Sequence, residues 1–313
     1  MARIETAGRP TTAEQTFPLA GEQTPSWYAE RPTNQLSDLD EAERLLRSTP
    51  PLAAARDHFR AARLLLHVGK PHQVVLRCAE LRDHAGNPAW TKAFGALHAE
   101  ALLHLGDLPS AEHEATAAMN TGGHQCAVLG PWATALLAES LVEQNRLEEA
   151  ATHLGGLLGS TELDGLPSLR VHGRLLMALD RPSDALTAFT RVARLARQHT
   201  TGLLPHLPWR SDMAEALLRL GRTDQAHALL TEELGSPAPG PRERGVALRF
   251  LSTTEEPERR LPLLSQAATE LRRSDGRVEL ARVLRDFAHT LSTLGELSTA
   301  EVFRHRAAGL LPA

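Results

Sequence analysis

The sequence interrupts its helical pattern six times at residues that readily adopt the left-handed backbone conformation. These positions are Gly69, Gly106, Asn145, Asp180, Gly221 and Gly295. Gly, Asn and Asp are the residues that most often end a helix in this conformation. From Gly69 to Gly221 the spacing stays close to the period of a helical-hairpin repeat, and the interval from Gly221 to Gly295 is long enough for two units. The chain is therefore expected to repeat a unit of two helices.

Three kinds of residue recur at fixed distances from each break. Seven residues before it the residue is small: Ala62, Ala99, Ala138, Gly173, Ala214 and Ala288. Four residues before it stands a leucine: Leu65, Leu102, Leu141, Leu176, Leu217 and Leu291. Five residues after it stand Val74, Ala111, Ala150, Ala185, Ala226 and Ala300. Two antiparallel helices approach to about 8–10 Å only where the facing side chains are small, so the register predicts tightly packed hairpins.

This register resembles the tetratricopeptide repeat (TPR), whose period is about 34 residues. The units here are longer and lack the usual tyrosine, which indicates a degenerate form. A further unit lies within residues 243–272, but its break, around Thr253 to Glu256, has no glycine and its register is open. We predict an all-α, right-handed α-solenoid of about seven degenerate TPR-like hairpins between about residues 52 and 311, in a solenoid domain of residues 37–313.

Residues 1–36 differ from the rest of the chain. They contain four prolines and many polar residues, without a helical period. They are expected to form a mobile N-terminal arm, part of which Trp27 and Tyr28 could hold against the solenoid. Ser37 and Asp40 form a capping-box pattern that predicts a short leading helix from residue 37 to residue 46.

Composition argues against several classes of function. The net charge is −4, so no large basic surface for nucleic acid or for an anionic membrane is expected. The two cysteines and fifteen histidines show no metal-ligand spacing, and no cofactor motif occurs, so neither a metal nor a cofactor is expected. No signal pattern or long apolar run is present, which favours a cytoplasmic protein.

Three tracts in the C-terminal half carry a second resemblance. They are Pro208-Trp209-Arg210, Gly245-Val246-Ala247-Leu248-Arg249 and Glu279-Leu280-Ala281-Arg282. Together they resemble the helical-repeat region of the large ATP-binding LuxR-type regulators of actinobacteria. The phosphate-binding motif of those regulators is absent, and only two residues follow Leu311, so no DNA-reading helix is expected after it. The resemblance implies only the middle module, which would receive an effector or partner linked to a biosynthetic pathway.

Stacked hairpins form a concave inner wall that commonly binds another molecule. On TPR geometry, the first helix of each hairpin supplies this wall. The candidate ligand-binding residues are Trp132, Glu139, Arg170, Arg174, Met177 and Glu215. Their mixture of apolar and charged groups suits a small-molecule or peptide effector, or a protein partner. The alternatives are a solvated charged face and a pure protein-interaction scaffold, and the oligomeric state is open.

An enzyme is the less favoured alternative. Glu100 and Glu139 occupy equivalent positions in adjacent hairpins and would stand roughly 10 Å apart, at the usual spacing of packed helices. Burial in an apolar groove would raise the pKa of one of them, which could then act as a general acid or base. Such a groove would suit a cofactor-independent cyclase or isomerase.

Overall fold

The computed structural model describes residues 35–48, 55–84, 87–121, 129–155, 165–198, 207–236 and 239–310. Every regular element in these ranges is a helix, as the sequence predicts. Residues 1–34 of the predicted N-terminal arm, including Trp27 and Tyr28, lie outside the described residues. None of the helices in these ranges is long and apolar enough to span a membrane.

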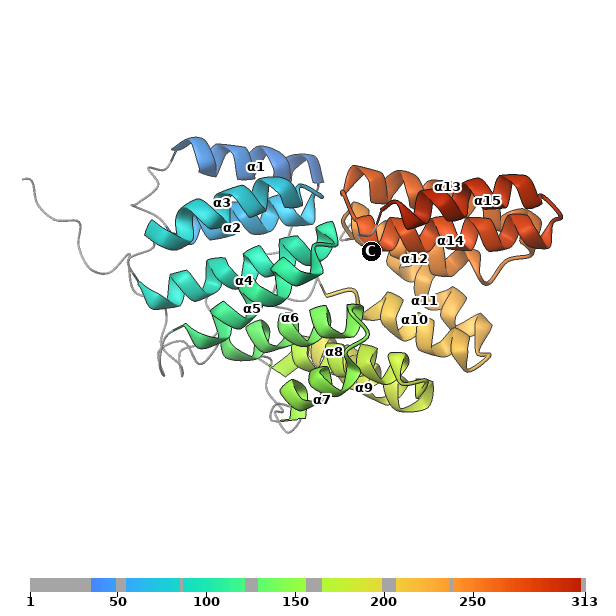
Figure 1. Ribbon diagram of the computed structural model, residues 1–313, viewed down its shortest axis with the longest axis horizontal. Helices are drawn as coiled ribbons and strands as arrows, with labels where there is room; N and C mark the ends of the chain where they lie inside the picture. Colours follow the sequence, from blue (N-terminus) through green and yellow to red (C-terminus); the bar gives the residue numbers. More distant parts are fainter. Residues whose placement is uncertain are drawn as a thin grey trace, which may run out of the picture.

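Within the described ranges a leading helix, α1 (Gln35–Ser48), precedes seven helical pairs (Figure 1). The pairs are α2 (Ala55–His67) with α3 (Pro71–His84), α4 (Pro88–Leu105) with α5 (Leu108–Asn120), α6 (Gly130–Glu143) with α7 (Leu147–Gly155), α8 (Leu166–Ala178) with α9 (Pro182–Gln198), α10 (Trp209–Arg219) with α11 (Thr223–Gly235), α12 (Pro241–Ser252) with α13 (Pro257–Arg273), and α14 (Arg277–Thr293) with α15 (Leu297–Ala308). The predicted α-solenoid of seven hairpins is thus confirmed. Helix α1 begins two residues before Ser37, so Ser37 lies inside its first turn rather than at its cap.

The six predicted breaks all have a left-handed backbone. Their φ angles range from 55° at Asp180 to 85° at Gly295. At each break, the next residue donates its N–H to the carbonyl of the recurrent leucine, as in the 2.8 Å bond from Lys70 N to Leu65 O. The break residue itself donates to the carbonyl three residues earlier. This pair of bonds satisfies the last carbonyls of the first helix and explains why Gly, Asn or Asp is needed there.

The small, leucine and alanine positions are all buried, which confirms the predicted packing register. One close approach is at Gly173 on α8, where an added Cβ would stand 2.7 Å from Cζ of Phe189 on α9. The sixth hairpin keeps part of this pattern. A Cβ on Gly245 of α12 would lie 2.5 Å from Cγ of Leu271 on α13. Its turn, however, has Thr253 at φ −71° and ψ −16°, so no left-handed residue marks the break.

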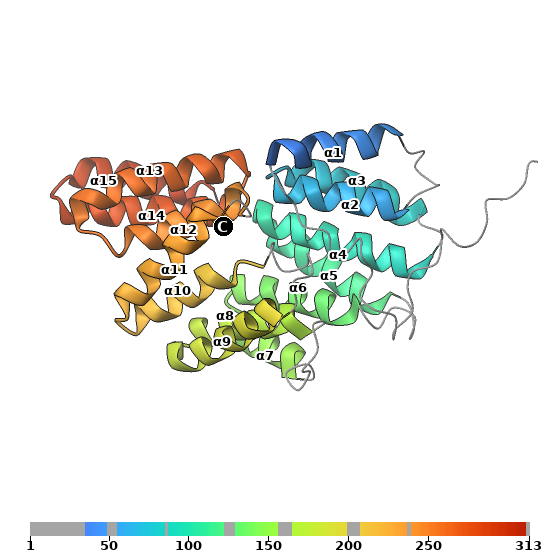
Figure 2. The same ribbon diagram turned by 180° about the vertical axis from the view of Figure 1, so that it is seen from behind.

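The solenoid closes on itself, so that its first and last hairpins meet. Figures 1 and 2 show α1 to α5 on one side and α12 to α15 on the other, with α6 to α9 along the lower edge of the views. The turn after α2 contacts the turn after α13, where a Cβ on Gly69 would stand 2.6 Å from Cα of Ser274. Arg282 of α14 also pairs with Glu143 of α6, at 2.5 Å between Nη2 and Oε2. Closure brings helices that are distant in sequence around one groove.

Candidate functional site

Two adjoining cavities lie in this groove. The larger has a volume of about 470 Å³ and is lined by residues of α6, α8, α10, α12 and α14. The smaller has a volume of about 90 Å³ and lies nearer α4, α6 and α8. Arg170, Pro208 and Arg242 line both cavities, so the two spaces adjoin and are described together as one candidate site.

All six residues predicted for ligand binding lie on the walls of these cavities. The larger cavity is lined by Arg170, Arg174, Met177 and Glu215. The smaller one is lined by Trp132, Glu139 and Arg170. The structure therefore brings the predicted residues together in space, while their role in binding stays a prediction.

Oppositely charged side chains form a continuous chain along the inner wall. In order, its members are Asp212, Arg170, Glu139, Arg174, Glu143, Arg282, Glu279 and Arg242. Arg170 Nε lies 2.5 Å from Asp212 Oδ2, and Arg174 Nη1 lies 3.0 Å from Glu139 Oε1. Because these residues belong to α6, α8, α10, α12 and α14, the chain joins both halves of the solenoid across the groove.

The carboxylates of Glu139 and Glu279 in this chain stay ionised. Burial alone would raise the pKa of Glu139, but the Arg170 and Arg174 guanidinium groups outweigh it and hold that pKa at about 2. Burial likewise opposes ionisation of Glu279, and Arg282 and Arg242 hold its pKa at about 2. Glu139 is therefore a fixed anion with two cationic partners, which makes it a poor proton donor or acceptor near neutral pH.

The smaller cavity contains two groups whose neutral forms are favoured. Burial raises the pKa of Glu100, although the charge of Arg63 opposes the change. Burial also lowers the pKa of His104 well below its ordinary value, with the charge of Arg242 acting in the same direction. Of the two carboxylates proposed from the sequence for acid–base chemistry, Glu100 has the raised pKa and Glu139 does not.

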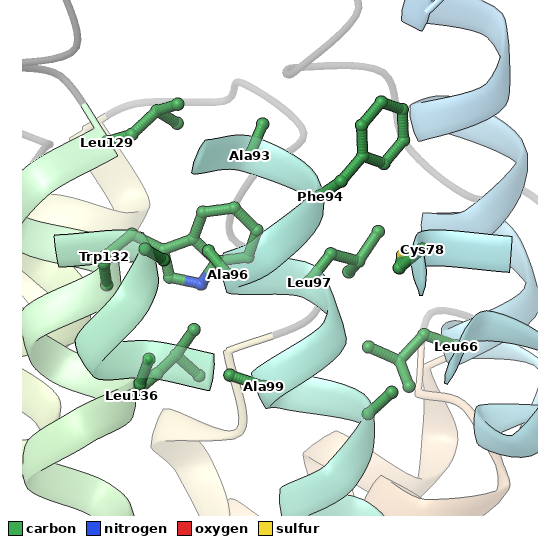
Figure 3. Close-up of a cluster of buried hydrophobic side chains, with 14 of the residues drawn as sticks. Leu66, Cys78, Ala93, Phe94, Ala96, Leu97, Ala99, Leu129, Trp132 and Leu136 are labelled. Carbon is green, nitrogen blue, oxygen red and sulfur yellow. The ribbon is translucent and has the colours of Figure 1, made fainter. Parts of the chain in front are cut away.

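Trp132 belongs to the core as well as to the smaller cavity. Its ring lies edge-on to Phe59, with centroids 6.2 Å apart and planes at 90°, and Trp90 and Phe94 also pack on Phe59. Figure 3 shows Trp132 and Leu136 of α6 on the side of α4 that carries Ala96 and Ala99. Trp132 is only 8% exposed, so it supports the cavity wall mainly by packing.

Arg242 is a site residue that the sequence analysis does not find, because the register of the sixth hairpin is open there. Gly245 and Leu248 stand seven and four residues before Ser252, the last residue of α12. Counted from Ser252, Arg242 is ten residues before the break, the offset that Arg170 has from Asp180. The small–leucine pair is the signal that could have fixed this register and placed Arg242 on the inner wall.

Comparisons with known proteins agree with the repeat architecture. A family model described as Tetratricopeptide repeat matches residues 131–155 and 208–231. The fold is similar to the crystal structure of a Rap protein complexed with competence and sporulation factor, with a TM-score of 0.65 and 14% identity, covering 87% of this chain and 78% of that one. It is also similar to the apo form of the quorum sensor NprR from B. thuringiensis, with a TM-score of 0.55 and 16% identity, covering 88% and 81%.

These comparisons show a TPR-like helical-repeat fold. No curated protein matches the sequence. Because the sequence identity to the two solved structures is low, the similarity to them concerns the fold alone.

Proposed function

We propose that the chain is an effector-binding helical-repeat module whose ligand, a small organic molecule or a short peptide, occupies the two adjoining cavities. The observation that carries the proposal is the pair of adjoining cavities whose walls include all six residues predicted for binding. A volume of about 470 Å³ lies within the range of typical ligand pockets, about 300–1,000 Å³. A Rap protein complexed with competence and sporulation factor and the quorum sensor NprR share the fold, which supports this assignment.

The mixed lining of the larger cavity also supports a ligand. Met177, Val246 and Phe250 offer apolar surface beside the charged side chains. A molecule with an apolar body and a few polar groups would match both kinds of surface. Such pairing of apolar area with a small number of oriented polar groups is what fixes a ligand's position in most small-molecule sites.

The test is a thermal-shift screen of short peptides and of metabolites from biosynthetic genes near this one. A ligand that binds only the folded protein stabilises it by about 2.7 kcal/mol at a hundredfold excess over Kd. Ala178 is exposed and lines the larger cavity, so Ala178→Trp should fill the cavity without disturbing the core and should abolish the shift. Ala151→Trp, at an exposed position on α7, is the matched control and should bind as the wild type does.

Each outcome distinguishes a class of function. A hit that survives Ala178→Trp unchanged would place binding elsewhere and contradict the proposal. Trp132→Ala is the weaker probe, because truncating a buried tryptophan is expected to cost about 3–5 kcal/mol of stability whether or not it touches a ligand. Absence of any hit, with specific capture of a protein partner, would favour a pure interaction scaffold.

The origin of the module belongs to the same proposal. We infer that it is related to the effector-sensing region of actinobacterial LuxR-type regulators and that its effector belongs to a biosynthetic pathway. All three tracts that carry this resemblance supply wall residues of the larger cavity, through Pro208, Arg249 and Glu279. Hits confined to compounds unrelated to the neighbouring genes would count against the biosynthetic link.

Catalysis is the second candidate function, and Glu100 with His104 is the observation that favours it. Both groups line the smaller cavity, and burial favours the neutral form of each. A protonated carboxyl group and a neutral imidazole can serve as acid and base for a cyclisation or isomerisation that needs no cofactor. Mass spectrometry of each hit after incubation tests this: turnover lost in Glu100→Gln, with binding retained, would support an enzyme, and an unchanged compound would support a sensor.

A further inference from the structure

The chain of alternating charges on the inner wall ends at an incompletely paired cation. Arg170, Arg174 and Arg282 each contact two carboxylates of the chain. Within the described residues Arg242 pairs with Glu279 alone, and at 3.6 Å between Nη2 and Oε1 this contact is an ion pair without a hydrogen bond. Its Nε is buried and has no hydrogen-bond partner in the part of the chain that the structure describes.

A guanidinium group in this condition is available to a ligand. Arginine presents five N–H donors in a planar fork that matches the two oxygens of a carboxylate or phosphate. A buried donor without a partner costs free energy, which is recovered when a ligand supplies the acceptor. Arg242 lines both cavities, so a ligand in either space can reach it.

The charged side chains that line the larger cavity favour binding of an anion. Seven arginines line this cavity (Arg170, Arg174, Arg219, Arg242, Arg249, Arg282 and Arg285), against five acidic residues (Glu143, Asp212, Glu215, Glu279 and Asp286). Burial raises the pKa of Glu215, which disfavours the charged form of this acid. Arginines thus outnumber acidic residues in the lining itself, while Glu139 and Asp180, which lie outside the lining, pair with Arg170, Arg174 and Arg219.

We propose that the effector carries an oxyanion, a carboxylate or a phosphate, that binds Arg242, while its apolar part lies against Met177, Val246 and Phe250. This inference rests on the proposed function and specifies the chemistry of the ligand. The carboxylate can belong to a small organic acid or to a peptide, because both present the same two oxygens to the guanidinium group.

Three matched sets of probes test the inference. They are phenylalkanoic acids with two to six methylene groups, the corresponding phenylalkyl phosphates, and the corresponding primary amides. The acids or the phosphates should bind at least tenfold more tightly than amides of equal length, as measured by isothermal titration calorimetry. The stronger of the two anionic sets identifies which oxyanion the site prefers.

Variants then assign the preference to one residue. Arg242→Gln removes the charge and should weaken anion binding at least tenfold while leaving amide binding unchanged. Arg242→Lys keeps the charge without the fork and should give an intermediate loss. Arg181→Gln is the control, because exposed Arg181 lines neither cavity and pairs with exposed Asp184, and it should behave as the wild type does.

The outcomes separate this inference from the proposed function. Amides that bind as tightly as the anions, in a manner blocked by Ala178→Trp, would overturn the anion site and leave the binding module standing. Anion binding that is equal in the wild type and Arg242→Gln would also overturn it. If none of the three sets binds while the thermal-shift screen yields an uncharged ligand, the anion site is overturned and the binding module again stands.

Discussion

At the scale of single residues, Glu233 of α11 is the clearest case of an ionisable group held away from its ordinary behaviour. Burial raises its pKa from 4.5 to about 7, although the 2.7 Å hydrogen bond from Ser211 Oγ opposes the shift. Between pH 4.5 and 7 the folded protein keeps a proton that the unfolded chain has released. Stability is therefore expected to fall as pH rises through this interval and to stay reduced above it.

Glu233→Gln removes this titration and keeps a group that can accept the hydrogen bond from Ser211. The difference in unfolding free energy between the variant and the wild type should increase by about 2 kcal/mol from pH 5 to pH 8. This follows because each unit of pKa shift corresponds to about 1.4 kcal/mol. Urea denaturation at the two pH values measures the gain. Glu232→Gln, at the exposed neighbouring position, should show no such dependence; the same pH profile in both variants would refute the buried-acid explanation.

The position of a residue relative to the break predicts whether its side chain faces the groove, but it does not predict whether that side chain is ionised. The offsets to the breaks alone place Arg170, Arg174 and Glu139 on the inner wall. The opposite pKa directions of Glu100 and Glu139 depend on which arginines surround each carboxylate. Those neighbours come from other hairpins, and an offset within one hairpin contains no information about them.

At the scale of the hairpin, replacing either of two glycines in first helices by alanine is expected to change stability in opposite directions. Gly173 of α8 lies under the ring of Phe189, whose Cζ and Cδ1 would stand 2.7 and 2.8 Å from an added Cβ. Gly95 of α4 has room, since an added Cβ would stand 3.4 Å from Cβ of Ala118, an ordinary contact. Gly173→Ala should therefore destabilise the protein by about 1–3 kcal/mol through overpacking.

Gly95→Ala should do the opposite and stabilise by about 0.5–1 kcal/mol, because alanine is the better helix former. Thermal and urea unfolding of the two variants measures both signs. Phe189→Leu in the Gly173→Ala background should recover part of the loss, since it removes the ring from the crowded position. A gain of stability in Gly173→Ala would show that α8 and α9 are not held together at this distance.

The hairpins are predictable because each is specified locally. The recurrent leucine supplies both a buried side chain and the carbonyl that closes the turn, so one residue carries two signals at a fixed offset. The sixth hairpin has the small residue and the leucine but no left-handed break, so it lacks the signal by which the other six turns were located. The missing turn signal also removes Arg242 from the predicted site.

At the scale of the whole molecule, closure of the solenoid is not predictable from the repeat. The ion pair between Glu143 and Arg282 joins residues far apart in the sequence, and no feature of the period requires it. The small rotation between successive hairpins decides whether the two ends meet, and that rotation depends on many side-chain contacts together. The repeat therefore predicts an open concave wall, whereas the structure encloses the groove between both halves.

The substitution Gly69→Ala tests directly whether the solenoid is closed. An added Cβ would stand 2.6 Å from Cα and 2.8 Å from Cβ of Ser274, on the turn after α13. Backbone cannot move aside as a flexible side chain can, so Gly69→Ala should separate the first hairpin from the last. Its φ of 80° adds the strain of a left-handed alanine, about 1–2 kcal/mol.

Gly295→Ala isolates that strain, because Gly295 has a φ of 85° and no atom of the described structure within 4 Å of an added Cβ. Gly69→Ala should cost about 1–3 kcal/mol more than Gly295→Ala in urea unfolding, the usual cost of overpacking. It should also raise the radius of gyration in small-angle X-ray scattering, whereas Gly295→Ala should not. Adding Ser274→Gly to Gly69→Ala removes the contact with Cβ of Ser274 but not the contact with its Cα, so only partial recovery is expected. Equal costs and equal radii for the two single variants would mean that the solenoid is open in solution and that the groove is not enclosed.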